Sequence, residues 1–365
     1  MYIYKRSDWP HFTWDLEKIG ALLAGVRNRQ GRLLGRMEAL GFTPRAEAEL
    51  QTQTLDVLKS SEIEGVFLNP DQVRSSVARR LGIDIANQVP AGRDVEGVVE
   101  MMVDASQNYS QQLIQERLFG WHAALFPTGR SGIHTITVGA WRDNENGPMQ
   151  IVSGPMGSER VHFVAPEAPA LEGEMSSFLA WLNGGANTDP VLKSAIAHFW
   201  FVTIHPFDDG NGRIARAIAD MLLARADGTP QRFYSMSAQI MKERKEYYKI
   251  LEETSKGTLD ITGWLVWFLN CLDHSLAASA ETLGAILAKT RFWDKNTGAP
   301  LNTRQRLMVN KLLDGFEGKL TSSKWAKIAK CSQDTALRDI QGLMDSGVLV
   351  KEAAGGRSTS YVINY

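Results

Sequence analysis

The segment 205–216 brings together side chains that could carry out phosphoryl transfer. A Gly-Asn-Gly turn at 210–212 precedes a helical pattern, so its backbone N–H groups and the helix dipole would attract an anion. Arg213 and Arg216 lie about one helical turn apart and could hold phosphates through forked hydrogen bonds. Asp209 could bind Mg²⁺, and a neutral His205, with an ordinary pKa of about 6.5, could accept a proton from a hydroxyl.

The same segment resembles the signature of the Fic (Fic/Doc) family, HPFx(D/E)GNGRxxR, and matches it at every specified position. The resemblance implies transfer of AMP from ATP to a Tyr, Ser or Thr hydroxyl of a target protein, with His205 as the base and Asp209 binding Mg²⁺. It assigns the binding of ATP phosphates to Gly210, Asn211, Gly212, Arg213 and Arg216. The alternative is an ordinary helix start, with Asp as a cap, glycines for a turn and arginines on a solvated face.

Two other functions are alternatives to AMP transfer. The kinase-like Doc branch has Lys in place of the second signature glycine, whereas this chain has Gly212, which favours AMP transfer. The second alternative is a DNA-binding transcriptional regulator whose Fic core only senses a nucleotide. The intact His205 and Asp209 favour the enzyme, because a sensor would need neither a base nor a full metal site.

An upstream segment, 60–65, ends a predicted amphipathic helix and resembles the family's inhibitory motif, (S/T)xxxE(G/N), through Ser60, Glu64 and Gly65. The resemblance implies that Glu64 pairs with Arg216 and blocks the site of the γ-phosphate. It also implies that Glu64 could align a water molecule for removal of AMP from a modified target. The alternative is an ordinary helix end with Gly65 as its C-terminal cap.

Two short β-prone runs, 151–153 and 160–164, flank a Gly/Pro-containing turn at 154–158 and predict a hairpin. It resembles the family's flap, where a target protein docks by strand pairing. We therefore include Arg160, Val161, His162 and Phe163 among the candidate site residues. Residues 139–142 resemble the Gly-x-x-Arg sequence that leads into the flap, although Trp141 and Phe163 are as compatible with core packing.

Residues 247–251 and 255–257 resemble the helix that lines the adenine pocket in family members. Their positions make Tyr247 and Ser255 candidate nucleotide contacts. Adjacent tyrosines on an amphipathic helix are equally compatible with packing, so both interpretations stay open.

Composition sets no strong preference for a charged partner, because 40 Lys and Arg residues balance 41 Asp and Glu residues. With 365 residues, 44% of them hydrophobic, the chain can build two or three domains with real cores. Cys271 and Cys331 lie far apart without metal-ligand spacing, which fits a reducing cytoplasm. The start lacks a signal-peptide pattern, and the apolar run 264–269 is too short to span a membrane. We expect a cytoplasmic protein with no membrane partner.

Helical periodicity dominates, so we expect a mainly α fold: a Fic-type helical core with a β-hairpin flap, an N-terminal helical region and a C-terminal winged helix-turn-helix. The expected domains are 1–112, with the inhibitory motif, 113–293, the catalytic domain, and 302–365, after a loop at 294–302. In the region between the inhibitory motif and that loop, helices are expected around 90–126, 170–183, 191–204, 212–225, 241–255 and 260–288.

The C-terminal region, 302–365, has the pattern of a winged helix. Helical segments at 320–329 and 333–345 are followed by β-prone runs at 348–350 and 360–363, which bracket a Gly-Gly-Arg loop at 355–357. The second helix of such a module commonly enters a DNA major groove. Ten basic and six acidic side chains make the region only mildly basic. We therefore expect either DNA binding or a protein-protein role, including a homodimer contact.

Overall fold

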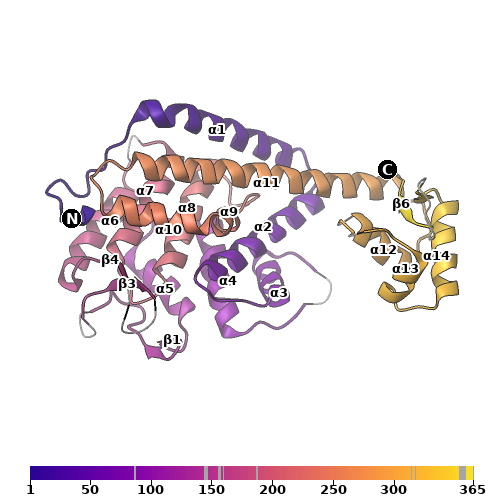
Figure 1. Cartoon of the computed structure of the whole chain (residues 1–365), viewed down its shortest axis with the longest axis horizontal. Helices are drawn as coiled ribbons and strands as arrows, with labels where there is room; N and C mark the ends of the chain where they lie inside the picture. Colours follow the sequence, from indigo (N-terminus) through magenta and orange to yellow (C-terminus); the bar gives the residue numbers. More distant parts are fainter. Residues whose placement is uncertain are drawn as a thin grey trace. The chain divides into compact units, whose positions relative to one another are not determined.

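The computed structural model describes residues 1–85, 88–143, 147–154, 158, 160–185, 188–313, 315–316, 318–352 and 359–364. Its contacts divide the chain into two compact units, Met1–Ala280 and Glu281–Tyr365. The described part is mainly helical, and its named strands form small antiparallel pairs (Figure 1). The predicted fold class, mainly α with a flap hairpin, is confirmed.

The first unit is built from helices that precede and follow two short hairpins. After a 3-10 turn at Ile3–Lys5 come α1 (Leu16–Glu38), α2 (Phe42–Ile63), α3 (Pro70–Leu81), α4 (Arg93–Gln107) and α5 (Gln115–Leu125). After the hairpins and a 3-10 turn at Ala168–Ala170 come α6 (Leu171–Asn183), α7 (Pro190–Ile204), α8 (Asn211–Asp227), α9 (Met236–Lys242), α10 (Arg244–Ser255) and α11 (Thr262–Lys295). α1 lies along α11, where Arg29 pairs with Asp273 at 2.7 Å (Figure 1).

The two hairpins of this unit lie between α5 and α6 in the sequence. The predicted one pairs β3 (Gln150–Ser153) with β4 (Arg160–Val164), with a register shift between Ile151 and Val152. Part of its turn, residues 155–157 and 159, lies outside the described residues. The other hairpin, β1 (Arg130–Ser131) with β2 (His134–Thr135), was not predicted because its strands are too short to show alternation.

α7 and α8 form the centre of the first unit and carry the signature segment between them. α7 begins at Pro190, where the Asp189 side chain accepts the Val191 N–H at 2.8 Å. Most α7 and α8 residues are buried, because α2, α4, α5, α6 and α9 pack around them. This burial gives the signature a rigid support.

Two helical regions differ from the sequence prediction. The segment expected as one helix around 90–126 is split into α4 and α5, because Asn108 leaves the helical conformation and its side chain donates back to Asp104 at 2.6 Å. α3 was not predicted, although Asn69 caps it, Pro70 occupies its first turn and Gly82 ends it with φ of 66°.

The second unit contains α12 (Thr303–Leu313), α13 (Ser322–Ile328), α14 (Gln333–Asp345), β5 (Leu349–Lys351) and β6 (Tyr361–Ile363). Its core includes Trp325, Ile340 and Leu343, and Phe292 near the end of α11 belongs to the same core. This packing explains why the unit starts within α11, before the loop expected at 294–302. The Gly-Gly-Arg loop of the predicted wing lies outside the described residues. Across the described residues, no helix is both long and apolar enough to cross a membrane.

Candidate active site

Arg142 fixes the conformation of the turn between α7 and α8. His205 ends α7 in the left-handed region, with φ of 52° and ψ of 59°. The Arg142 side chain donates from Nε to the His205 carbonyl at 2.8 Å and from Nη2 to the Pro166 carbonyl at 2.6 Å. Its backbone N–H donates to the Pro206 carbonyl at 2.9 Å. Because a non-glycine residue is rarely found at such φ values, these contacts are what keep His205 in place.

The imidazole of His205 is held in the form that suits a base. Its Nδ1 lies 3.2 Å from the Val202 carbonyl, which assigns the proton to Nδ1 and leaves Nε2 as an acceptor. Burial lowers the pKa of His205 to about 4, against the opposing effect of the Val202 carbonyl. The ring is therefore neutral near pH 7 and able to take a proton.

Asn211 fixes the turn that leads into α8. It is buried, its Oδ1 accepts the Phe207 N–H at 3.0 Å, and its Nδ2 donates to the Phe207 carbonyl at 2.7 Å. Gly210 has φ of 83°, and a Cβ there would lie 2.9 Å from the ring of Phe126. Only glycine fits this position without strain. The first N–H groups of α8 lack intrahelical acceptors, which makes this helix start suitable for an anion.

Asp209 presents its carboxylate beside this helix start, with its side chain 43% exposed. Oδ1 accepts the Gly210 N–H at 2.6 Å, and Oδ2 accepts a hydrogen bond from the Ser131 hydroxyl on β1. In the part of the chain that the structure describes, no cluster of three or more His, Cys, Asp or Glu side chains could hold a metal ion. A lone carboxylate suits Mg²⁺, which usually takes its other ligands from water and substrate phosphates.

His122 on α5 is a residue that the sequence analysis missed. Its ring stacks on Phe207 at 4.1 Å, accepts the Gly139 N–H on Nδ1 at 3.3 Å, and places Nε2 3.2 Å from the Asp209 carbonyl. These partners assign the proton to Nε2, which donates to Asp209. Burial lowers the pKa of His122 to about 4, so the ring stays neutral. Nothing in the sequence around residue 122 signals this contact, because it depends on packing of α5 against the signature.

Arg213 is buried beside the start of α8 and retains an unused donor. Its guanidinium lies 5.0 Å from the centre of the Phe126 ring and 3.8 Å from Asp209 Oδ2. Among the described residues, no acceptor lies within hydrogen-bonding distance of Arg213 Nε. A buried donor without an acceptor is costly, so this site fits an oxyanion such as a phosphate oxygen.

Arg216 is bound by the end of α2. Its Nε donates to Ser60 Oγ at 2.9 Å, and its Nη2 donates to the Ser60 carbonyl at 2.8 Å and to Glu64 Oε1 at 2.7 Å. Burial acts to lower the pKa of Arg216, but the charge of Glu64 and the hydrogen bond to it, together with the effects of Tyr247 and Tyr248, outweigh burial and the pKa is raised. The structure thus places Ser60, Glu64 and Arg216 in one contact.

The end of α2 aims Glu64 at the start of α8. α2 ends at Ile63, and the chain turns at Gly65, with φ of 80°, so that the Val66 N–H donates to the Ser61 carbonyl at 3.0 Å. The Tyr248 hydroxyl of α10 donates to the Ile63 carbonyl at 3.3 Å. Gly65 therefore has the backbone role of a C-terminal helix cap in addition to its place in the motif.

The β3–β4 hairpin is joined to α10 through Glu252. His162 Nδ1 lies 2.6 Å and Arg160 Nη2 lies 3.3 Å from this carboxylate, which also pairs with Lys256 at 2.7 Å. Phe163 is buried, with its ring edge-on to Tyr2 at 5.1 Å, whereas Val161 is exposed. Phe163 is thus a packing residue of the hairpin, and Val161 faces solvent.

Tyr247 and Ser255, the candidate adenine contacts, are both buried. Tyr247 Oη lies 2.9 Å from His198 Nε2, and Ser255 Oγ donates to the Glu252 carbonyl at 3.0 Å. Both side chains therefore pack within α10 and its neighbours, and their contact with a nucleotide stays a prediction.

The fold and this site define a Fic-type helical domain. Residues 112–223 match the Fic/DOC family model, and residues 2–83 match the Domain of unknown function (DUF4172). The chain therefore carries a Fic/DOC domain, and it is homologous to proteins named protein adenylyltransferase Fic.

Among these relatives, the one from Culex quinquefasciatus is 28% identical over 236 residues, which cover 64% of this chain and 42% of the relative. The one from Drosophila mojavensis is 25% identical over 260 residues, covering 70% of this chain and 46% of the relative. The chain thus spans less than half the length of these relatives.

Solved structures share the fold. A Fic family protein from Desulfovibrio desulfuricans superposes with a TM-score of 0.56 and 19% identity, covering 97% of this chain and 98% of that one. A Fic domain containing signaling protein from Bacteroides thetaiotaomicron gives a TM-score of 0.51 and 20% identity, covering 73% of this chain and 97% of that one.

Proposed function

We propose that this chain is a protein adenylyltransferase, which transfers AMP from ATP to a Tyr, Ser or Thr hydroxyl of a target protein and of itself. The observation that carries this proposal is the position of a neutral His205 next to a helix start that presents Asp209 and Arg213. A base, a carboxylate for a metal and a buried cation for phosphates are what the reaction requires. The homologous adenylyltransferases support the same assignment.

In the proposed reaction, His205 Nε2 accepts the proton of the target hydroxyl as its oxygen bonds to the α-phosphorus of ATP. The bond from that phosphorus to the bridging oxygen breaks, and pyrophosphate leaves. The left-handed turn that Arg142 holds sets the direction in which the imidazole faces. The contribution of this chain is therefore positioning of a base and stabilisation of negative charge.

The start of α8 would hold the phosphates through the backbone N–H groups of Asn211 and Gly212 and through Arg213. Asp209 would hold Mg²⁺, which neutralises phosphate charge when it is bound. Arg216 would bind the terminal phosphate only when Glu64 is displaced, because Glu64 and Ser60 occupy its Nε and Nη2 donors.

Glu64 would therefore act as a built-in brake. It takes the guanidinium face that the γ-phosphate needs, and it lies over the backbone at Gly212. Its side chain remains 31% exposed, which supports a second role in which the carboxylate aligns a water molecule for removal of AMP from a modified target.

The target protein would dock along the β3–β4 hairpin. Within the described residues, this sheet has two strands, so strand edges are available to an added peptide. Val152 and Val161 are paired across the hairpin and are 47% and 40% exposed. They would contact apolar side chains that flank the modified hydroxyl.

For the C-terminal unit, we propose a protein-protein role, such as homodimer contact, ahead of DNA binding. The exposed face of α14 includes Leu337, 45% exposed, and Arg338, but also the acidic Asp334 and Asp345. A helix that enters a DNA groove usually carries a basic face. A duplex titration of the full chain at low salt tests this choice, because DNA binding would appear there as a salt-dependent shift.

The function is tested with wild type, Glu64→Gly and Glu64→Gly/His205→Ala, each incubated with ATP and Mg²⁺ and analysed by intact mass. Loss of one charge-assisted bond, about 1.5–3 kcal/mol, corresponds to roughly 10- to 100-fold. We therefore expect an AMP adduct that is strong in Glu64→Gly, faint in wild type and absent in the double variant. Absence of the adduct in every variant that binds ATP would favour the nucleotide-sensing regulator instead.

A further inference from the structure

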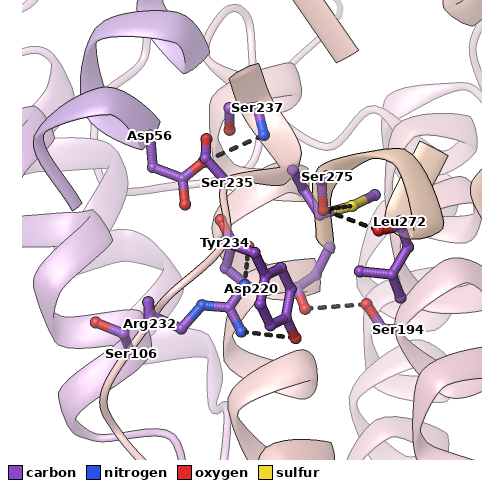
Figure 2. Close-up of polar contacts among 12 residues, drawn as sticks. Asp56, Ser106, Ser194, Asp220, Arg232, Tyr234, Ser235, Ser237, Leu272 and Ser275 are labelled. Carbon is purple, nitrogen blue, oxygen red and sulfur yellow. Dashed lines mark hydrogen bonds and ion pairs between the residues drawn. The ribbon is translucent and has the colours of Figure 1, made fainter. Parts of the chain in front are cut away.

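A buried cluster of charged side chains lies behind the contact between Glu64 and Arg216. Asp56 of α2, Asp220 of α8 and Arg232 from the segment before α9 are 1%, 3% and 1% exposed (Figure 2). The sequence analysis gave none of them a role. Asp56 joins α2, and Asp220 joins α8, to the segment at 232–237, so both helices are anchored to the same stretch of chain.

The two carboxylates of this cluster have different partners. Asp56 Oδ1 accepts the Ser235 hydroxyl at 2.6 Å and the Ser237 N–H at 3.1 Å. Asp220 Oδ1 accepts Arg232 Nη2 at 2.9 Å. Within the described residues, Asp220 Oδ2 has no hydrogen-bond partner although it is buried. An unpaired buried carboxylate oxygen is costly when charged and much less so when protonated.

The cluster holds more acidic than basic groups. Arg232 also lies 3.4 Å from Asp227, which accepts the Tyr234 hydroxyl at 2.7 Å. One guanidinium thus faces three buried carboxyl groups. Burial, reinforced by the nearby charge of Asp56, raises the pKa of Asp220, and burial also raises that of Asp56. The cluster therefore retains a proton at neutral pH.

The elements that surround the cluster do not remove its excess of acidic over basic groups. The charged or titratable groups facing the cluster are Arg216 and Asp227 of α8, Arg232 and Tyr234 before α9, and Arg27 of α1. Arg216 is already paired with Glu64, and Arg27 acts on Asp227. The neutral Gln30 of α1 donates to Asp227, and α4 contributes the neutral Ser106 near this site.

The cluster lies on the same faces of α2 and α8 as the Glu64–Arg216 contact. Asp56 precedes Ser60 by four residues and Glu64 by eight, and Asp220 follows Arg216 by four. Residues four apart share one face of a helix. The faces of α2 and α8 that form the Glu64–Arg216 contact therefore continue to Asp56, about two turns from Glu64, and to Asp220, about one turn from Arg216. A change in spacing at this pair would act directly on the brake.

We propose that Asp56 and Asp220 are positioning residues that together retain one proton, and that the singly protonated cluster keeps Glu64 on Arg216. When the proton is lost to solvent, two buried carboxylates repel each other, the end of α2 moves off α8, and Arg216 is freed. This inference rests on the proposed role of Glu64 as a brake. It makes relief of the brake dependent on pH.

The test compares AMP incorporation by wild type and Glu64→Gly between pH 6.5 and 9.5. Glu64→Gly lacks the brake and reports how the chemistry itself depends on pH. We expect the ratio of Glu64→Gly to wild type to fall by roughly tenfold over this range, which corresponds to about one pKa unit of coupling. In an Asp220→Asn background, which has no proton to lose, the ratio should stay constant.

Asp104→Asn is the matched control, because the Asp104 carboxylate accepts from Arg117 and Trp121 of α5 rather than from Arg232 or Ser235 of the cluster. In that background, the ratio should fall as it does in wild type. An equal fall in the Asp220→Asn background would overturn the proposal. Asp56→Asn removes the same repulsion and replaces Asp220→Asn if that variant does not fold.

Amide hydrogen exchange of residues 57–66 distinguishes failure of this inference from failure of the proposed function. We expect protection factors in wild type, corrected for intrinsic exchange, to drop roughly tenfold between pH 7 and 9, and to remain constant in Asp220→Asn. This result supports the proton-sharing pair even if Glu64→Gly makes no AMP adduct. A pH-independent protection factor in wild type would overturn the pair even if the adduct forms.

Discussion

The carboxylate of Glu64 fills the space that a side chain at Gly212 would need. A Cβ at Gly212 would lie 2.2 Å from Glu64 Oε1 and 3.3 Å from Arg216 Nη1. The glycine therefore lets Glu64 approach the backbone of α8 and the guanidinium of Arg216 together. In the proposed reaction, this space becomes open to a phosphate once Glu64 leaves.

Glu64→Gly should lower stability in a way that nucleotide reverses. Arg216 is 2% exposed, and Glu64 is the charged acceptor of a guanidinium that otherwise donates to Ser60. Loss of the charged acceptor should lower the free energy of unfolding by about 1–3 kcal/mol. Thermal unfolding with a non-hydrolysable ATP analogue should therefore show a larger rise in Tm for Glu64→Gly than for wild type. Glu64→Gln, which keeps an acceptor oxygen, should fall between them, and equal shifts in all three would contradict competition for Arg216.

Arg142→Met should impair transfer without weakening nucleotide binding. It removes the donors to the His205 and Pro166 carbonyls, so the left-handed turn at His205 relaxes. Misplacement of a base by about 1 Å can cost roughly 100-fold in rate. In the Glu64→Gly background, we expect a loss of that order, with ATP affinity within about twofold by calorimetry. Arg142→Lys, with one donor group, should lose less, and a parallel loss of ATP affinity would assign Arg142 to the nucleotide site instead.

The sequence predicted the parts of this site that are contiguous or that belong to a recognisable motif. His205, Asp209 and Arg213 lie within one turn and the helix start that follows it, so their proximity could be predicted from the sequence of this one segment. The contact of Glu64 with Arg216 joins positions far apart in the chain, yet the motif around Ser60 and Gly65 implied it. Its inhibitory role stays a prediction.

The parts that the sequence did not predict depend on packing between elements. His122 lies on an ordinary amphipathic helix, and it reaches Asp209 only because α5 packs on the signature. Asp56 and Asp220 each look like a solvated acidic residue until α2 and α8 are brought together. Tyr247 shows the converse, because its position in the sequence suggested a ligand contact, whereas its side chain is buried against His198.

His122→Phe should raise the Mg²⁺ concentration that AMP transfer requires. The phenyl ring can retain the stacking on Phe207 but cannot donate to the Asp209 carbonyl or accept the Gly139 N–H. We expect roughly a tenfold higher Mg²⁺ concentration for half-maximal AMP transfer in the Glu64→Gly background, from loss of about 1.4 kcal/mol of hydrogen bonding. His134→Phe, at the exposed β1–β2 hairpin, is the control for an aromatic replacement. An unchanged Mg²⁺ requirement would limit His122 to packing.

The pH profile of Glu64→Gly should reflect His205 as a base with a strongly lowered pKa. Burial lowers the pKa of His205 to about 4, so the imidazole is neutral at pH 6–9 and can accept a proton. The neutral form is lost only as the pH falls through this pKa. Removal of Glu64 takes away a negative charge that favours the protonated ring, so this loss of charge acts to lower the pKa of His205 further. We expect kcat/KM to be flat from pH 6 to 9 and to decline below about pH 5, which steady-state kinetics would show. The kcat/KM of Glu64→Gly/His205→Ala should be lower by roughly 10²–10⁴-fold and should not decline below about pH 5. A half-point near pH 6.5 would mean that the ring is solvated in the working enzyme and that burial does not set its protonation.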